Sequence, residues 1–149
     1  MLSAEFDVVV VGAGPGGCAA AAGLARCGWR VLLAEAERYP VHKMCGEFMS
    51  PEAWGLLARL GVDGAVRRAG AVPIRRVSVT SSGAAWRGEL PGEAIGVSRW
   101  ALDPLLFDAA VEAGAEGRQG ARASAFERDA AGRVRVGLAG GGAATERLV

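Results

Sequence analysis

The segment DVVVVGAGPGGCAAAAGLARCGWRVLLAEAE, residues 7–37, decides the fold of this chain. Its valine-rich start predicts a strand over Phe6–Val11, because runs of β-branched residues are typical of strands buried on both faces of a parallel sheet. The alanine-rich stretch that follows predicts a helix over Cys18–Cys27 that ends at Gly28. A second strand is expected over Trp29–Ala34. This order predicts a βαβ unit with parallel strands.

The turn between the first strand and the helix matches the spacing GxGxxG. Its residues are Gly12, Ala13, Gly14, Pro15, Gly16 and Gly17. In this pattern Gly12 permits a tight turn, Gly14 lets the backbone approach a pyrophosphate, and Gly17 allows close packing of the helix. Glu35 follows the second strand, about 20 residues on, where a carboxylate can accept hydrogen bonds from both ribose hydroxyls and repels a 2′-phosphate. The sequence therefore predicts a Rossmann-type dinucleotide site that disfavours NADP.

The rest of the chain predicts two further helices and several short strands. One helix is expected over Pro51–Leu60, with Ser50 as its N-cap and Gly61 as its end. An apolar stripe between Leu102 and Ala113 predicts the other helix, for which Asp103-Pro104 offers a start. The strands are expected over Ile74–Ser81, Ala84–Leu90, Ile95–Val97, Arg122–Arg128, Arg133–Leu138 and Thr145–Val149, with Gly140–Gly142 as the last turn.

These elements predict an α/β fold with a parallel sheet and an antiparallel β-meander. We expect a Rossmann-type dinucleotide-binding domain over residues 1–149. Within it, residues 1–38 form the βαβ dinucleotide unit, and residues 39–97 form an insertion with a helix and short strands. Residues 98–149 are expected to form a helix and the meander.

Composition excludes several other classes of protein. A chain of 149 residues is long enough for one domain that buries roughly 70% of its unfolded surface. The formal net charge of +1 indicates neither a nucleic acid nor an anionic membrane as a partner. No apolar stretch reaches the ~18 residues that span a bilayer. The three cysteines contain no CxxC pair and support neither a disulfide framework nor a metal site. We expect a soluble, cytoplasmic protein.

Three segments resemble a known group of flavoproteins. Residues 7–37 resemble the FAD-binding motif of the glutathione-reductase-type proteins. The segment KMCGEFMSP, residues 43–51, resembles the K-x-C-G-E-x-x-S-P motif of their geranylgeranyl-reductase-like branch. The segment GVSRWALD, residues 96–103, resembles a G-[ILV]-x-R-x-x-L-D stretch that this branch shares with aromatic-ring monooxygenases. The resemblance runs through essentially the whole chain. It implies FAD as the cofactor, with NAD(P)H as a candidate external electron donor.

The resemblance also implies roles for residues outside the glycine turn. The glycine turn and Glu35 would hold the ADP part of FAD, and the backbone of Cys45 and Gly46 would lie along the cofactor near the flavin. The further cofactor-binding candidates are Ala36, Lys43, Arg99 and, at the adenine, Ala123. No catalytic residue is assigned.

Chemistry leaves alternatives open for three of these residues. Arg99 has a guanidinium group that suits a pyrophosphate, but it can also form an ion pair with Asp103 at i,i+4. Lys43 either stabilises a reduced flavin or is a solvated loop residue. Cys45 lacks an obvious general base, since the chain's one histidine is His42 on the same loop, so close backbone approach is favoured over thiol chemistry.

Members of this family are longer than this chain. After a strand such as Glu146–Val149 they continue into a G-A-D-G-type segment, a G-D motif and a substrate-binding sheet. We therefore expect a truncated N-terminal portion with an exposed sheet edge that favours self-association.

Three functions are compatible with the sequence. The first is a flavin-dependent reductase or dehydrogenase that acts on a C=C bond of a hydrophobic, lipid- or polyketide-like small molecule. The second is an FAD-dependent monooxygenase or halogenase. The third is a non-catalytic nucleotide-binding fragment that needs a partner chain. The Lys-x-Cys-Gly-Glu segment at residues 43–47 favours the first.

Overall fold

A computed structural model describes residues 5–130, 132–139 and 144–148 of the chain. Two compact units can be distinguished. The first contains the residues up to Val41 together with those from Asp103 onward, and the second contains His42–Leu102. The glycine turn and Glu35 lie in the first unit.

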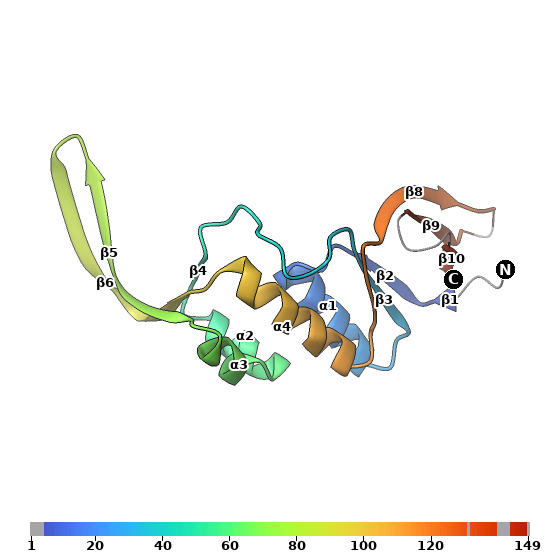
Figure 1. The fold of residues 1–149 in the computed structure, drawn as a ribbon, viewed down its shortest axis with the longest axis horizontal. Helices are drawn as coiled ribbons and strands as arrows, with labels where there is room; N and C mark the ends of the chain where they lie inside the picture. The colour runs from blue at the N-terminus through green and yellow to red at the C-terminus, as the bar shows by residue number, and fades with distance from the viewer. Residues whose placement is uncertain (1–4, 131, 140–143, 149) are drawn as a thin grey trace. The chain divides into compact units, whose positions relative to one another are not determined.

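A three-stranded parallel sheet and helix α1 organise the first unit (Figure 1). The strand order is β2-β3-β7. The bounds are Val8–Val11 for β2, Pro15–Arg26 for α1, Val31–Glu35 for β3 and Glu116–Gln119 for β7. Every residue of β3 is buried, because β3 is the central strand. The predicted βαβ unit is confirmed.

The valine-rich strand differs from its prediction. It breaks at Asp7 into β1 (Glu5–Phe6) and β2, which belong to different sheets. Asp7 Oδ2 accepts a hydrogen bond of 2.8 Å from the Arg30 N–H at this break. The prediction that this strand is buried on both faces was wrong for β2, since β2 is an edge strand of the described sheet and Val11 is 50% exposed.

Helix α1 also differs at both ends. It begins at Pro15, three residues before the predicted start, because proline fits the first turn of a helix. Its C-cap is Cys27, and Gly28 follows with a φ of +87°.

Helix α4 (Arg99–Glu112) begins before the predicted Asp103-Pro104 start. Ser98 caps it, since Ser98 Oγ accepts a hydrogen bond of 3.3 Å from the Ala101 N–H. The helix continues to β7, a strand that sequence reasoning missed. Phe107 and Val111 lie directly over Gly117 of β7, where a Cβ atom would come within 2.5 Å of Phe107 and 2.6 Å of Val111.

The predicted meander completes the first unit. Its strand order is β1-β10-β9-β8, antiparallel except between β1 and β10. The bounds are Arg122–Arg128 for β8, Val134–Ala139 for β9 and Ala144–Leu148 for β10. A core of Phe6, Leu32, Ala34, Ala121, Val136 and Leu138 joins this sheet to β3. The expected turn at Gly140–Gly142 lies outside the described residues.

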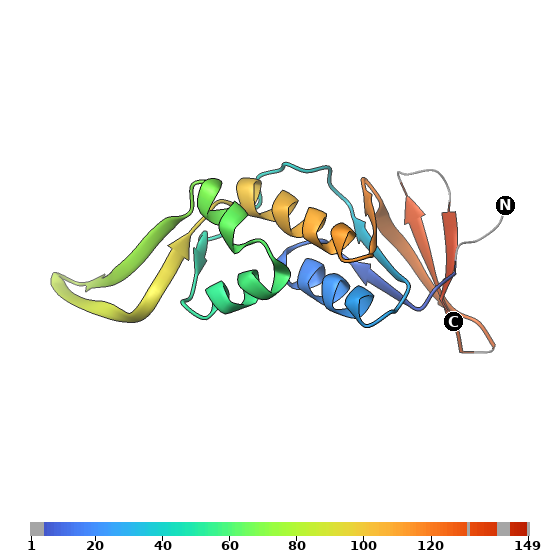
Figure 2. The same ribbon diagram turned by 90° about the horizontal axis from the view of Figure 1, so that it is seen from below.

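The second unit combines an antiparallel sheet with two short helices. Figure 2 shows the neighbouring helices α2 (Ala53–Leu60) and α3 (Asp63–Arg68). The predicted start of α2 was wrong, because Pro51 forms a turn and Glu52, not Ser50, is the N-cap. Its predicted end is confirmed, as Gly61 caps α2 with a φ of +80°. Sequence reasoning missed α3.

The sheet of the second unit has the order β4-β6-β5. Its strands are β4 (Phe48–Met49), β5 (Val72–Ser81) and β6 (Ala84–Gly96). Two strands separated by a Pro-Gly turn were predicted where β6 is continuous. The register shifts at this place between Ile74 and Arg76 of β5, so Pro91-Gly92 lies in a bulge of β6.

Candidate functional site

The glycine turn closes tightly at the carboxyl end of the parallel sheet. Gly12 adopts a φ of +93° and donates a hydrogen bond of 2.8 Å from its N–H to Ala34 O. A Cβ on Gly17 would lie 1.9 Å from Gly12 O, so no other residue fits there without moving the turn. The predicted reasons for glycine at these two positions, a tight turn and close helix packing, match this geometry.

The N-terminus of α1 faces this turn. Gly14 is the N-cap, Pro15 is at the first helical position, and no side chain among the described residues caps the helix. No acidic residue lies in the first turn either. The positive end of the helix dipole is therefore not compensated by a carboxylate of that turn, and a helix start of this kind suits an anion such as a diphosphate.

The Glu35 carboxylate lies against the same turn. Glu35 ends β3 and is 4% exposed. Its Oε2 accepts a hydrogen bond of 2.9 Å from the Ala13 N–H, and its Oε1 accepts one of 3.1 Å from the Glu37 N–H. A buried carboxylate needs such donors to offset its desolvation. The structure thus brings together the predicted phosphate-binding turn and the predicted ribose-binding acid.

Tyr39 is part of this site, and sequence reasoning missed it. Its hydroxyl donates a hydrogen bond of 2.6 Å to Ala13 O and lies 3.1 Å from Glu35 Oε2. Burial, followed by the negative charges of Glu35 and Asp103, raises the pKa of Tyr39 above its ordinary value. The hydroxyl therefore keeps its proton. The one sequence signal was an isolated tyrosine four residues after the acid.

Two further predicted cofactor-binding residues, Ala36 and Ala123, lie near the same end of β3. Ala36 directly follows Glu35 and is half-buried. The Ala121 N–H donates a hydrogen bond of 2.8 Å to Glu35 O, which fixes the start of β8. Ala123, two residues further along, is half-buried and pairs with Leu138 of β9.

The remaining predicted residues belong to the second unit, and their roles toward a cofactor stay predictions. They are Lys43, Cys45, Gly46 and Arg99. Cys45 is exposed, and its Sγ accepts a contact of 3.4 Å from the Glu47 N–H. Glu47 has a φ of +53°, unusual for a residue with a side chain, and its carbonyl accepts a hydrogen bond of 2.9 Å from the Val97 N–H. Lys43 is half-buried, and Arg99 is the first residue of α4.

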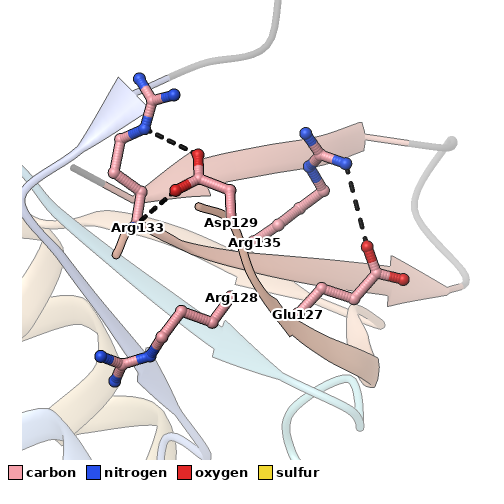
Figure 3. Close-up of a pocket in the computed structure, with 5 residues that line it drawn as sticks. All are labelled: Glu127, Arg128, Asp129, Arg133 and Arg135. Carbon is pink, nitrogen blue, oxygen red and sulfur yellow. Dashed lines mark hydrogen bonds and ion pairs between the residues drawn. The ribbon is translucent and has the colours of Figure 1, made fainter. Parts of the chain in front are cut away.

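A charged surface depression on the β8–β9 hairpin contains none of the predicted site residues, although Ala123 lies on the same strand β8. Figure 3 shows two ion pairs in it: Arg133 with Asp129 at 2.8 Å, and Arg135 with Glu127 at 3.8 Å. The Arg128 side chain points away from both pairs (Figure 3). The Arg133–Asp129 pair is half-buried, whereas the Arg135–Glu127 pair is exposed and therefore contributes little to stability.

The described residues contain neither a metal-binding cluster nor a membrane-spanning helix. No group of three or more His, Cys, Asp or Glu side chains in that part of the chain could hold a metal ion. None of the helices seen in the structure is both long and apolar enough to cross a membrane.

Comparison with known proteins gives a consistent result. Residues 5–146 match the family model described as FAD binding domain. The chain is 34% identical over 142 residues to a menaquinone reductase of Mycolicibacterium smegmatis, covering 89% of this chain and 33% of the relative. It is 39% identical over 117 residues to a digeranylgeranylglycerophospholipid reductase of Methanopyrus kandleri, covering 75% of this chain and 29% of the relative.

The fold is also similar to that of a solved flavoprotein. The myxobacterial chondrochloren halogenase CndH, described as a variant of FAD-dependent halogenases, matches with a TM-score of 0.85 and 27% identity. The match covers 97% of this chain and 35% of the halogenase. The chain thus spans about a third of the length of the proteins it matches.

Proposed function

The chain belongs to the FAD-binding domain family, whose cofactor is FAD, and we propose that its glycine turn and Glu35 bind the ADP half of that cofactor. The observation that carries this proposal is the contact between Ala13 N–H and Glu35 Oε2 at 2.9 Å. It holds a ribose acceptor beside a helix N-terminus suited to phosphates. Ala123 would lie at the adenine, and Ala36, which follows Glu35, would also contact the cofactor.

The residues present fit the chemistry of an adenosine diphosphate. The start of α1 carries no acidic residue that would repel a diphosphate, and Gly12 and Gly17 keep side chains out of the turn. Glu35 supplies an acceptor for ribose hydroxyls, and its buried negative charge opposes a 2′-phosphate. FAD is therefore favoured over NADP at this site, and NAD(P)H is proposed only as an external electron donor.

We also propose cofactor contacts from the second unit. Cys45 and Gly46 would lie along the flavin side of the cofactor, and Arg99 would reach a phosphate or the ribityl chain. The left-handed backbone of Glu47 supports this proposal, because strained positions of non-glycine residues cluster at binding sites. Lys43 would place a positive charge near the flavin.

For the activity of the whole protein we propose a flavin-dependent reductase that acts on a hydrophobic, isoprenoid-like small molecule. When bound, FAD supplies the redox chemistry, and the protein positions it and keeps out competing reactions. The support comes from two kinds of relative that cover at least three quarters of this chain, the menaquinone reductases and the digeranylgeranylglycerophospholipid reductases. The Lys43–Glu47 segment favours the same chemistry.

The second candidate function is an FAD-dependent monooxygenase or halogenase, favoured by the structural match to the chondrochloren halogenase. The two functions differ in how reduced flavin is consumed. In the FAD-loaded protein, photoreduced flavin would be mixed separately with menaquinone without oxygen and with air-saturated buffer. Reoxidation by the quinone supports a reductase, whereas reaction with oxygen that incorporates an oxygen atom or halogen into a substrate favours the second candidate.

Two further properties are proposed for the chain. A cytoplasmic location agrees with its free cysteines, Cys18, Cys27 and Cys45. Self-association through the edge strand β2 is supported by the exposure of Val11. Analytical sedimentation of the wild type and of Val11→Lys tests this. The variant should self-associate less, because a charge on an edge strand opposes pairing with another chain.

A ligand series tests the ADP-site proposal. The purified chain would be titrated with FAD, ADP and FMN, following flavin fluorescence. If the site recognises the ADP half, ADP displaces FAD, whereas FMN, which lacks adenosine, does not compete. Displacement of FAD by FMN but not by ADP would locate recognition at the flavin and overturn the proposal.

A further inference from the structure

Two successive peptide groups of the glycine turn are held from the protein side. The Gly12–Ala13 peptide donates its N–H to Glu35 Oε2 at 2.9 Å. The Ala13–Gly14 peptide accepts two hydrogen bonds at Ala13 O, from the Tyr39 hydroxyl at 2.6 Å and from Cys18 Sγ at 3.0 Å. Ala13 itself is fully buried. The orientation of both peptides is therefore set by side chains that lie outside the turn or in the body of α1.

The direction of one carbonyl fixes the direction of the next amide. In a planar trans peptide, the C=O and the following N–H point in opposite directions. Because Ala13 O points toward the Tyr39 hydroxyl, the Gly14 N–H points away from it. Gly14 is the N-cap of α1, so its amide adds to the N–H groups at the start of this helix. These are the groups that a diphosphate would contact.

Tyr39 is well placed to hold this carbonyl. Its backbone N–H donates a hydrogen bond of 2.7 Å to Gln119 Oε1 of β7. Its ring meets the ring of Phe107 of α4 edge-on, with centroids 5.8 Å apart. These two contacts hold the backbone and the ring of Tyr39, and its hydroxyl donates the 2.6 Å hydrogen bond to Ala13 O.

We infer that Tyr39 is a positioning residue of the diphosphate site, which holds the Ala13–Gly14 peptide so that the Gly14 amide faces a bound phosphate. This inference rests on the proposed function, because it assigns Tyr39 a role in binding the same ADP half. It differs from the role of Glu35, since the hydroxyl acts only through the Ala13–Gly14 peptide, whereas the carboxylate holds the Gly12–Ala13 peptide and is also the proposed acceptor for ribose.

The test is the variant Tyr39→Phe, which removes the hydroxyl and keeps the ring beside Phe107. Binding of ADP and of adenosine would be measured by NMR with the ¹⁵N-labelled chain, following the Gly14 amide resonance. We expect Tyr39→Phe to weaken ADP binding about tenfold, the effect of about one hydrogen bond, and to leave adenosine binding nearly unchanged. The shift of the Gly14 amide on addition of ADP should shrink.

Two comparisons separate this role from a general loss of structure. Glu35→Gln is expected to weaken adenosine binding as well as ADP binding, because both ligands contain the ribose. Cys18→Ala removes the weaker donor to the same carbonyl and should weaken ADP binding less than Tyr39→Phe does. Thermal melting of each variant checks that the fold is retained.

The outcomes distinguish the inference from the proposed function. If the wild type binds neither ADP nor FAD, the proposed ADP site fails, and the inference fails with it. If the wild type binds ADP and Tyr39→Phe binds it equally well, or loses ADP and adenosine equally, only the positioning role of Tyr39 is overturned.

Discussion

The backbone N–H of Ala13 donates a hydrogen bond of 2.9 Å to the side chain of Glu35, although the two residues are 22 positions apart. This bond joins the turn after β2 to the end of β3, so the residues proposed for phosphate and for ribose form one structure. Because Glu35 is 4% exposed, its charge depends on such donors for compensation. A substitution that disturbs the glycine turn should therefore also disturb Glu35, and the reverse should hold.

Two alanine substitutions in α1 should have opposite effects on stability. In Gly17→Ala the new Cβ would lie 1.9 Å from Gly12 O, so the variant should lose about 1–3 kcal/mol of unfolding free energy or more. In Gly23→Ala the Cβ meets no atom within 4 Å, and the helix should gain about 0.5–1 kcal/mol. Urea denaturation measures both. A Gly17→Ala variant as stable as the wild type would show that the turn is not closed as described.

The raised pKa of Tyr39 should make the stability of the chain depend on pH in the alkaline range. Its pKa in the folded chain is raised above the ordinary 10.0, because of burial and the charge of Glu35. The folded state therefore retains this proton more tightly than the unfolded state. The stability that it contributes is fully present below about pH 10 and is lost as the pH rises further.

Urea denaturation between about pH 9 and pH 11 measures this loss. Over this range the unfolding free energy of Tyr39→Phe should fall less with rising pH than that of the wild type. Since Tyr39 is the chain's only tyrosine, its ultraviolet absorbance follows its ionisation directly. A tyrosinate signal that develops at the ordinary pKa while the chain stays folded would contradict the buried hydrogen bond.

The proposed flavin-side position of Cys45 predicts selective protection of a thiol. Cys27 and Cys45 are exposed and should react with iodoacetamide, whereas the buried Cys18 should not. FAD should slow alkylation of Cys45 severalfold, and ADP, which lacks the flavin, should not. Cys27, the C-cap of α1, is the internal control. Peptide mass spectrometry measures each rate, and equal rates at Cys45 with and without saturating FAD would remove this residue from the site.

The sequence allowed prediction of those parts of the site that depend on local spacing. The positions of Gly12, Gly17 and Glu35 follow from one βαβ pattern, and the structure places them together. Tyr39 could not be predicted, because its role comes from a contact with a residue 26 positions earlier in the chain. A short polar loop has no hydrophobic periodicity from which such a contact could be predicted.

Strand β7 was not predicted either, because it too depends on contacts with distant residues. Its residues, EGRQ, show no apolar alternation, and its place in the sheet depends on pairing with β3 and on cover from α4. Phe107 and Val111 supply that cover over Gly117. Similarly, β6 continues through Pro91-Gly92 because a bulge accommodates these residues, which the turn signal alone does not indicate.

The most direct test of the account is an FAD titration of the wild type, Glu35→Gln and Glu37→Gln. Glu37 is the matched control, because its exposed carboxylate contacts only Arg122, at 3.4 Å, among the side-chain pairs described. We expect Glu35→Gln to weaken FAD binding about tenfold or more, since hydrogen bonds to a charged group are lost, and Glu37→Gln to bind as the wild type does. Equal FAD affinity in all three chains would contradict the assignment of Glu35 to the cofactor.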